Sequence, residues 1–176
     1  MKRSTIITTI AFAFIMLLST NINAQKFSKL DKSPMDAAIY RTSRNAPPTV
    51  KVIYSRPQLN GRRLSSLAPK GKVWRTGANE STEINLYNDV TIGGQSVKAG
   101  TYTLFTIPGD SEWTIIINSS VNTWGAFSYN EANDVARIKG TASTSDESLE
   151  AFSIAFTDDG TMHMGWGTVR VAVPMK

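Results

Sequence analysis

The 176-residue sequence predicts an all-β fold: a single-domain antiparallel β-sandwich of the jelly-roll or immunoglobulin-like kind, with a barrel as the second choice. Three observations predict it. Apolar and polar residues alternate with the period of two that strands require, these stretches are rich in β-branched and aromatic residues, and turn residues recur about every ten residues. This spacing predicts about nine or ten short strands.

Export is predicted by the first residues of the chain. Lys2 and Arg3 give a positive start, an apolar run over residues 6–18 follows, and Ala24 supplies a small residue for cleavage. We therefore expect residues 1–24 to be a signal peptide and the protein to be periplasmic or extracellular. A retained anchor is the alternative, but the apolar run is short for a bilayer span and no second run follows. We accordingly expect no stable membrane insertion after cleavage.

After the signal peptide, we expect residues 25–49 to be an N-terminal segment that packs on a β-sandwich domain formed by residues 50–176. Within this segment, "SPMDAAIY" at 33–40 predicts a short helix. Ser33 is a residue type that caps helix N-termini, and Pro34 suits the first helical position, where its missing N–H costs no hydrogen bond.

Within the domain, short strands are expected to alternate with tight turns. Alternation and strand-forming residues predict strands at 50–56, 83–88, 101–107 and 113–118. Gly93 and Gly94 predict a hairpin turn, because glycine adopts a positive φ without a Cβ clash. Residues 108–110, Pro-Gly-Asp, predict a second turn. The polar stretches "RNAPPTV" (44–50) and "STSDES" (143–148) are expected to be loops.

The last part of the sequence contains the clearest hairpin. Asp159 and Gly160 supply the turn, and large apolar side chains alternate on both sides of it. One face of this hairpin is therefore expected in the core: Phe152, Ile154, Phe156, Met162, Met164 and Trp166. Trp113, which is in phase with apolar neighbours on its own strand, is expected there too.

The composition excludes several classes of function. The sequence contains no cysteine, which removes thiolate metal sites, cysteine nucleophiles and disulfides. The sequence contains one histidine, His163, and a usual zinc site needs more histidine or cysteine ligands than this. No glycine-rich nucleotide-binding loop and no serine-hydrolase motif occurs. We expect neither a metal nor a cofactor.

Charge is unevenly distributed along the sequence. The net charge is +5, yet residues 37–79 contain no Asp or Glu, whereas the acidic residues cluster late. If the basic segment folds onto one face, that face attracts anions; the alternative is that the two halves interleave and their charges cancel. We expect no nucleic-acid binding, because the chain is predicted to be exported and contains no recognisable nucleic-acid-binding module.

The candidate binding site lies in "KVWRTGANESTEI" at residues 72–84. Gly77 allows a sharp bend, which would bring the residues that follow it beside Arg75. A guanidinium group suits anions, amide and carboxylate groups suit hydroxyls, and an exposed indole suits a sugar ring. We therefore expect noncatalytic binding of a saccharide or small anionic ligand by Trp74, Arg75, Asn79 and Glu80.

Alternatives to this binding site remain open. Trp74 and Trp124 are each followed closely by glycine in a polar stretch, so both are expected to be exposed. The structural alternative is an internal ion pair of Arg75 with Glu80 or Glu83 that pins a corner. The enzymatic alternative is a hydrolase of envelope or extracellular glycans that uses Glu80 as acid or base. Glu80 and Glu83 point to opposite faces on an extended chain, and converge only if the segment turns.

Six segments together resemble a known family. They are "SPMD" (33–36), "VKVIYSRP" (50–57), "GKVWRTGANESTEI" (71–84), "VKAGTYTLFTIPG" (97–109), "EWTIIIN" (112–118) and "WGAFSYNEANDVARI" (124–138). In this order they resemble domain-of-unknown-function family 2911 of small exported bacterial proteins. The resemblance implies an export signal before a single β-rich domain, and it implies no activity, ligand or catalytic residue. A structural or partner-binding envelope protein is therefore a third possibility.

Overall fold

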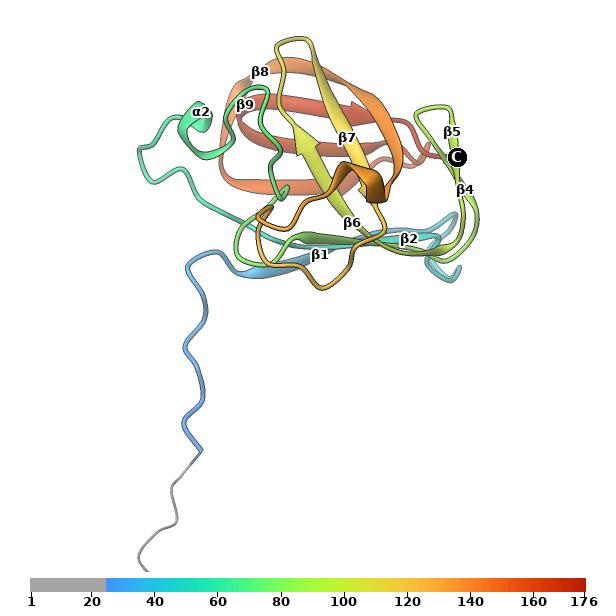
Figure 1. The fold of residues 1–176 in the computed structure, drawn as a ribbon, viewed down its shortest axis with the longest axis horizontal. Helices are drawn as coiled ribbons and strands as arrows, with labels where there is room; N and C mark the ends of the chain where they lie inside the picture. Colours follow the sequence, from blue (N-terminus) through green and yellow to red (C-terminus); the bar gives the residue numbers. More distant parts are fainter. Residues whose placement is uncertain (1–24) are drawn as a thin grey trace, which may run out of the picture. The chain divides into compact units, whose positions relative to one another are not determined.

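The computed structural model describes residues 25–176, and this range contains nine strands and two short helices (Figure 1). The strands are β1 (Met35–Tyr40), β2 (Val50–Ser55), β3 (Thr82–Leu86), β4 (Val90–Ile92), β5 (Gln95–Val97), β6 (Gly100–Ile107), β7 (Glu112–Asn118), β8 (Asp134–Phe156) and β9 (Met162–Val173). The helices are α2 (Leu64–Leu67) and the 3-10 helix η1 (Glu131–Asn133). The predicted all-β class is confirmed. The predicted signal peptide, residues 1–24, lies outside the described residues.

Residues 31–176 form one unit built around a large antiparallel sheet. Its seven strands run in the order β1-β2-β3-β6-β7-β8-β9, and β4 and β5 form a separate two-stranded hairpin. The large sheet curls into a half-barrel, and Figure 1 shows β8 and β9, in orange and red, bending around its far side. Residues that follow β2 help to close the curl, because the Phe152 N–H of β8 donates to the Pro57 carbonyl (2.9 Å). No helix in the described range is long and apolar enough to cross a membrane.

The strands have an inner face toward the core and an outer face. On the inner face, Val52 of β2 lies opposite Ile84 of β3, and both are fully buried. On the outer face, Ile53 lies opposite Glu83, which in turn lies opposite Thr103 of β6. Because successive residues of a strand point to opposite faces, one step along the chain separates the core from the outer surface.

A cluster of aromatic rings packs in the core. The Trp74 ring stacks on Trp166 with centroids 5.5 Å apart, and it contacts Phe152 (5.0 Å) and Trp113 (6.2 Å). Trp74 is only 6% exposed, so the prediction that it is exposed is wrong. The backbone N–H of Trp74 donates to the carbonyl of Thr106 on β6 (2.7 Å). This pairing places the indole on the inner face with the buried Thr106 side chain.

The predicted hairpins are confirmed. Gly93 and Gly94 join β4 to β5 with φ values of 52° and 88°, and Gly160 has a φ of 85° in the turn between β8 and β9. Trp113 is buried as expected. The residues expected in the core of the last hairpin are buried, except that Phe156 is partly exposed and packs on Tyr40 with centroids 5.8 Å apart.

The predicted helix at residues 33–40 is wrong. Residues 35–40 form β1, which pairs with β2 over its whole length. Ser33 does not act as a helix cap; its own N–H donates to the Asp31 carboxylate (2.7 Å). A brief helix signal is weak beside the ladder of hydrogen bonds that a neighbouring strand offers.

The predicted loop at residues 143–148 is also wrong, because this segment lies within β8. Its side chains are mostly exposed, so polar residues are tolerated there. The pairing of β8 with β9 shifts register between Thr144 and Leu149, and such irregularities bend a strand. The polar stretch therefore marks the bend of a long strand.

The segment between β7 and β8, residues 119–133, folds over the outer face of the sheet, and we call it the outer loop. Its Tyr129 ring packs on Phe105 of β6 with centroids 5.2 Å apart, which leaves Phe105 1% exposed. The Tyr129 hydroxyl donates to Asp134 Oδ2 (2.7 Å), which also accepts from Arg137 (2.7 Å). Burial and the Asp134 carboxylate raise the pKa of Tyr129 to about 12. The C-terminal half of the outer loop is thus fixed to the sheet.

Candidate functional site

Residues 74–81 form a loop that leads into β3, and we call it the corner loop. Thr76 and Asn79 have positive φ values of 57° and 60°. This conformation is uncommon for asparagine and a true outlier for a β-branched residue. Thr76 is held in it by its hydroxyl, which donates to the Thr106 hydroxyl (3.1 Å), and by its carbonyl, which accepts from the Thr82 hydroxyl (2.8 Å). The corner loop therefore turns back sharply before β3 begins.

The corner loop pairs with the outer loop. Glu80 forms an antiparallel bridge with Trp124, and the Gly125 N–H donates to the Asn79 carbonyl (3.0 Å). Opposite residues in an antiparallel pair project their side chains to the same side. Two segments about 45 residues apart in the sequence are thereby brought together, and they place Trp124 beside Glu80.

Arg75 is half-buried behind this junction. Its Nη1 donates to the Asn79 carbonyl (3.2 Å), which is the same acceptor that the Gly125 N–H uses. None of the ion pairs in residues 25–176 includes Arg75, Glu80 or Glu83. The ion pair that was the structural alternative to the binding site is therefore absent from the described residues, and hydrogen bonds to the Asn79 carbonyl hold the corner instead.

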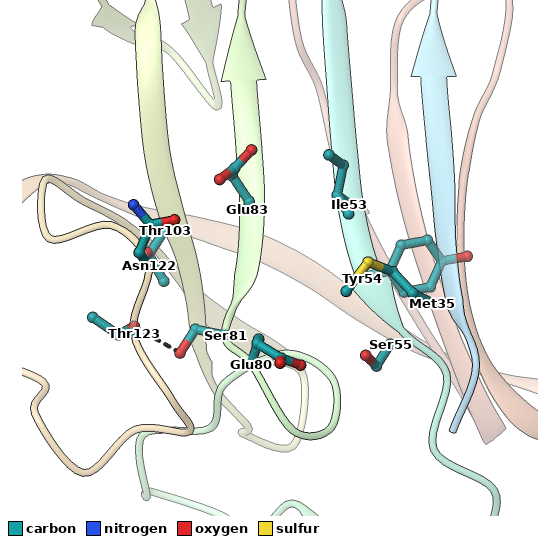
Figure 2. Close-up of a pocket in the computed structure, with 10 residues that line it drawn as sticks. All are labelled: Met35, Ile53, Tyr54, Ser55, Glu80, Ser81, Glu83, Thr103, Asn122 and Thr123. Carbon is teal, nitrogen blue, oxygen red and sulfur yellow. Dashed lines mark hydrogen bonds between the residues drawn. The ribbon is translucent and has the colours of Figure 1, made fainter. Parts of the chain in front are cut away.

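A pocket of about 250 Å³ opens on the outer face beside the corner loop (Figure 2). It is lined by residues of β1, β2, β3, β6 and both loops: Met35, Ile53, Tyr54, Ser55, Glu80, Ser81, Glu83, Thr103, Asn122 and Thr123. Figure 2 shows Glu80 and Ser55 facing each other across the space between β3 and β2. One side of the pocket is apolar, and the rest offers carboxylate, hydroxyl and amide groups.

A second hollow of about 290 Å³ adjoins the first, since both are lined by Met35, Ser55 and Glu80. It adds polar groups and one aromatic ring: Asp31, Ser33, Asn79 and Trp124. Trp124 is 58% exposed, as the sequence predicted. The Asn79 side-chain amide donates to Asp31 Oδ1 (3.2 Å). We call the two hollows together the Glu80 groove.

All charged residues that line the Glu80 groove are acidic: Asp31, Glu80 and Glu83. Glu83 is oriented by the Asn85 amide, which donates to its Oε1 (2.8 Å). The Glu80 carboxylate accepts no hydrogen bond from any other described residue. The groove is thus ready to receive hydrogen-bond donors or positive charge.

Glu80 and Glu83 line the same pocket, although they lie three residues apart. The condition that the sequence left open, a turn in this segment, is met. Asn79 is left-handed, Glu80 pairs with the outer loop, and β3 begins only at Thr82. Glu83 then takes its face from the alternation within β3, independently of Glu80.

The structure brings together part of the predicted site. Asn79 and Glu80 line the groove, and Trp124 joins them. Trp74 lies in the core instead, and Arg75 supports the junction from behind. Residues 25–176 contain no group of three or more metal-ligating side chains placed to hold an ion.

Sequence reasoning missed several lining residues. Ser55 and Ile53 were read as parts of a strand, and Met35 as part of a helix. Their outward position follows from the alternation of β2 and β1, but the sequence does not say which face of these strands a loop leaves open. Asn122 and Thr123 carry no motif of their own, and only the pairing of the two loops brings them to the groove.

These features define an all-β protein with a curled antiparallel sheet and a polar, acidic groove where two loops meet on its outer face. The chain belongs to the family described as protein of unknown function (DUF2911), whose sequence model matches residues 33–175. The resemblance seen in the sequence is thereby confirmed. Comparison with curated proteins and with solved structures gave no match.

Proposed function

We propose that this protein is exported and binds a hydroxyl-rich, saccharide-like ligand in the Glu80 groove without transforming it. One observation carries the proposal: the exposed Trp124 ring lies in the same hollow as the Asp31, Asn79 and Glu80 side chains. The apolar face of a sugar ring packs on an indole, while its hydroxyls take up hydrogen bonds with carboxylate and amide groups.

The charge of the groove favours a saccharide over an anion. The sequence left both open because Arg75 was expected in the site. The Arg75 guanidinium is engaged with the Asn79 carbonyl, and the charged groups that line the groove are carboxylates. A negatively charged ligand would be repelled by them.

Trp124 provides the test of the proposal. The experiment titrates four sugar tetramers into the protein and measures the heat of binding by calorimetry. Three are β-1,4-linked tetramers of glucose, N-acetylglucosamine and glucosamine, and the fourth is an anionic galacturonate tetramer. At least one neutral or cationic tetramer is expected to bind, and Trp124→Ala to weaken it by about tenfold or more, the effect of losing roughly 1.4 kcal/mol.

Phe127→Ala is the matched control for Trp124→Ala. Phe127 is also an exposed aromatic residue of the outer loop, at 86%, but it lines neither hollow of the groove. This variant is expected to bind like the parent protein. If no tetramer binds, or if both variants lose affinity equally, the proposal is wrong.

A glycan hydrolase is the second candidate, because Glu80 and Glu83 line one pocket and such enzymes work with two carboxyl groups. It predicts that new reducing ends appear when the protein is incubated with a tetramer that it binds. Glu80→Gln would abolish their release, and Glu147→Gln, a change of an exposed glutamate outside the groove, would leave it unchanged. Binding without any release of reducing ends favours the binding protein.

A further inference from the structure

Ser55 is a second, independent sign that the Glu80 groove is built for a ligand. The Ser55 residue is 3% exposed, and it lines both hollows of the groove. Its hydroxyl makes no side-chain hydrogen bond with any residue in 25–176, and Figure 2 shows it directed toward Glu80. The described residues contain no buried side-chain nitrogen or oxygen atom that lacks a partner, so the Ser55 hydroxyl oxygen reaches the open space of the groove. A ligand in the groove can therefore form a hydrogen bond with it.

The neighbours of Ser55 define the chemistry of that partner. Glu80 faces it with a carboxylate that has no ion-pair partner in the described residues, and Glu83 contributes a second carboxylate to the same pocket. Carboxylates accept hydrogen bonds and do not donate them, and a hydroxyl can also accept. The three groups together call for a donor-rich, positively charged partner.

Basic side chains nearby do not supply this charge. Lys51 lies on the outer face of β2, but its ammonium is placed over the Tyr87 ring, 6.0 Å from the centroid. Arg75 donates to the Asn79 carbonyl. Neither residue lines the groove. The negative charge of the pocket is thus left for a ligand to neutralise.

We propose that the ligand of the Glu80 groove carries a primary ammonium group, as an amino sugar does, and that Glu80 and Ser55, which face each other in Figure 2, accept its N–H donors. A primary ammonium has donors for both groups, and Glu83, which is turned toward Asn85, adds negative charge to the same pocket. Hydrogen bonds between an ammonium and a carboxylate are charge-assisted, and they are stronger than those between neutral groups. The proposal rests on the proposed saccharide-binding function and names the class of sugar.

The experiment compares two ligands that differ at the nitrogen. The β-1,4-linked glucosamine tetramer and its N-acetylated counterpart present the same ring faces, but only the first is cationic at about pH 6, where free carboxylates are ionised. Calorimetry on protein purified after expression of the full chain is expected to show the glucosamine tetramer binding about tenfold or more tightly. Added salt should reduce this difference, because it screens the charges.

Variants of the groove locate the effect. Glu80→Gln and Glu83→Gln keep the shape of the side chain and remove its charge. Glu80→Gln is expected to reduce the preference for the glucosamine tetramer about tenfold, and Glu83→Gln to reduce it by less, because Glu83 acts only through its charge. Ser55→Ala should weaken the same tetramer while it leaves thermal unfolding unchanged or improved. Glu147→Gln is the charge-matched control, and it should alter neither affinity nor preference.

The outcomes separate this inference from the proposed function. If both tetramers bind equally, or if the preference survives both glutamine variants, the ammonium proposal is wrong while saccharide binding stands. If no tetramer binds, both proposals fail. Cadaverine, a diamine without a sugar ring, is expected to bind more weakly than the glucosamine tetramer. If the two ligands bind equally well, the groove binds free amines and the assignment to an amino sugar is wrong. Saturable binding of calcium that displaces the tetramer would also contradict it.

Discussion

Replacement of Trp74 by alanine tests whether this residue supports the fold or binds the ligand. The indole is 6% exposed and stacks on Trp166 with centroids 5.5 Å apart and planes 17° apart. It also meets Phe152 and Trp113 edge-on at 5.0 and 6.2 Å. Its removal therefore leaves a cavity between three other large rings.

The expected loss of stability is large. Truncation of a buried tryptophan to alanine costs about 3–5 kcal/mol from lost transfer free energy and from the cavity. A domain of this size loses roughly 2–4 °C of Tm for each kcal/mol, so Trp74→Ala is expected to lower Tm by about 6–20 °C. Trp124→Ala is the matched control, because the same change at a 58% exposed side chain should stay within about 0.5 kcal/mol.

Urea unfolding followed by far-UV circular dichroism is the assay, since it does not depend on the indole that is removed. The midpoint should fall for Trp74→Ala at an unchanged m-value, which identifies a change in stability rather than in compactness. A loss below about 1 kcal/mol would refute the packing argument. Ligand affinity lost in Trp74→Ala without a loss of stability would restore the original assignment of Trp74 to the binding site.

Three further predictions follow from single features. Gly160→Ala should lower the unfolding midpoint, because the added Cβ would lie 2.6 Å from the Met175 carbonyl oxygen at a φ of 85°, and an unchanged midpoint would contradict this geometry. The pKa of Tyr129 is raised to about 12, so the contribution of this hydroxyl to folding stability is complete below about pH 10 and is lost as the pH rises through about 12. Tyr129→Phe should therefore reduce the loss of stability at alkaline pH in urea melts. A pH profile identical to that of the parent protein would exclude the Tyr129–Asp134 contact as the source of this loss. N-terminal sequencing of the protein from fractionated cells should find Gln25 as the first residue outside the cytoplasm, and a mature chain that begins at Met1 would contradict the predicted export.

Strand positions could be predicted from the sequence because they depend on short-range patterns. Two stretches of alternating residues, 50–55 and 101–107, predicted strands that the structure contains. The turns predicted at Gly93-Gly94 and Asp159-Gly160 are also present. Residues 33–40 and 143–148 failed for the opposite reason. Each of these segments forms a strand because it pairs with a neighbouring strand, and the local sequence does not predict that pairing.

The candidate site could be predicted only where it follows from one segment. Asn79 and Glu80 share the corner loop, and a bend near Gly77 was enough to suggest that they face a ligand. Trp74 was misplaced because a glycine and polar residues follow it, whereas its pairing with β6 decides its orientation. Ser55 and Trp124 join the groove through contacts between distant segments, which no local pattern reveals.

The central claim is that the Glu80 groove binds a ligand against Trp124. The most direct measurement follows the side-chain indole N–H signals of the four tryptophans by NMR while the glucosamine tetramer is added. We predict that the Trp124 signal, assigned through Trp124→Phe, shifts and saturates, while the buried Trp74, Trp113 and Trp166 signals stay in place. Absence of a saturable Trp124 shift, or shifts confined to the buried rings, would contradict the account.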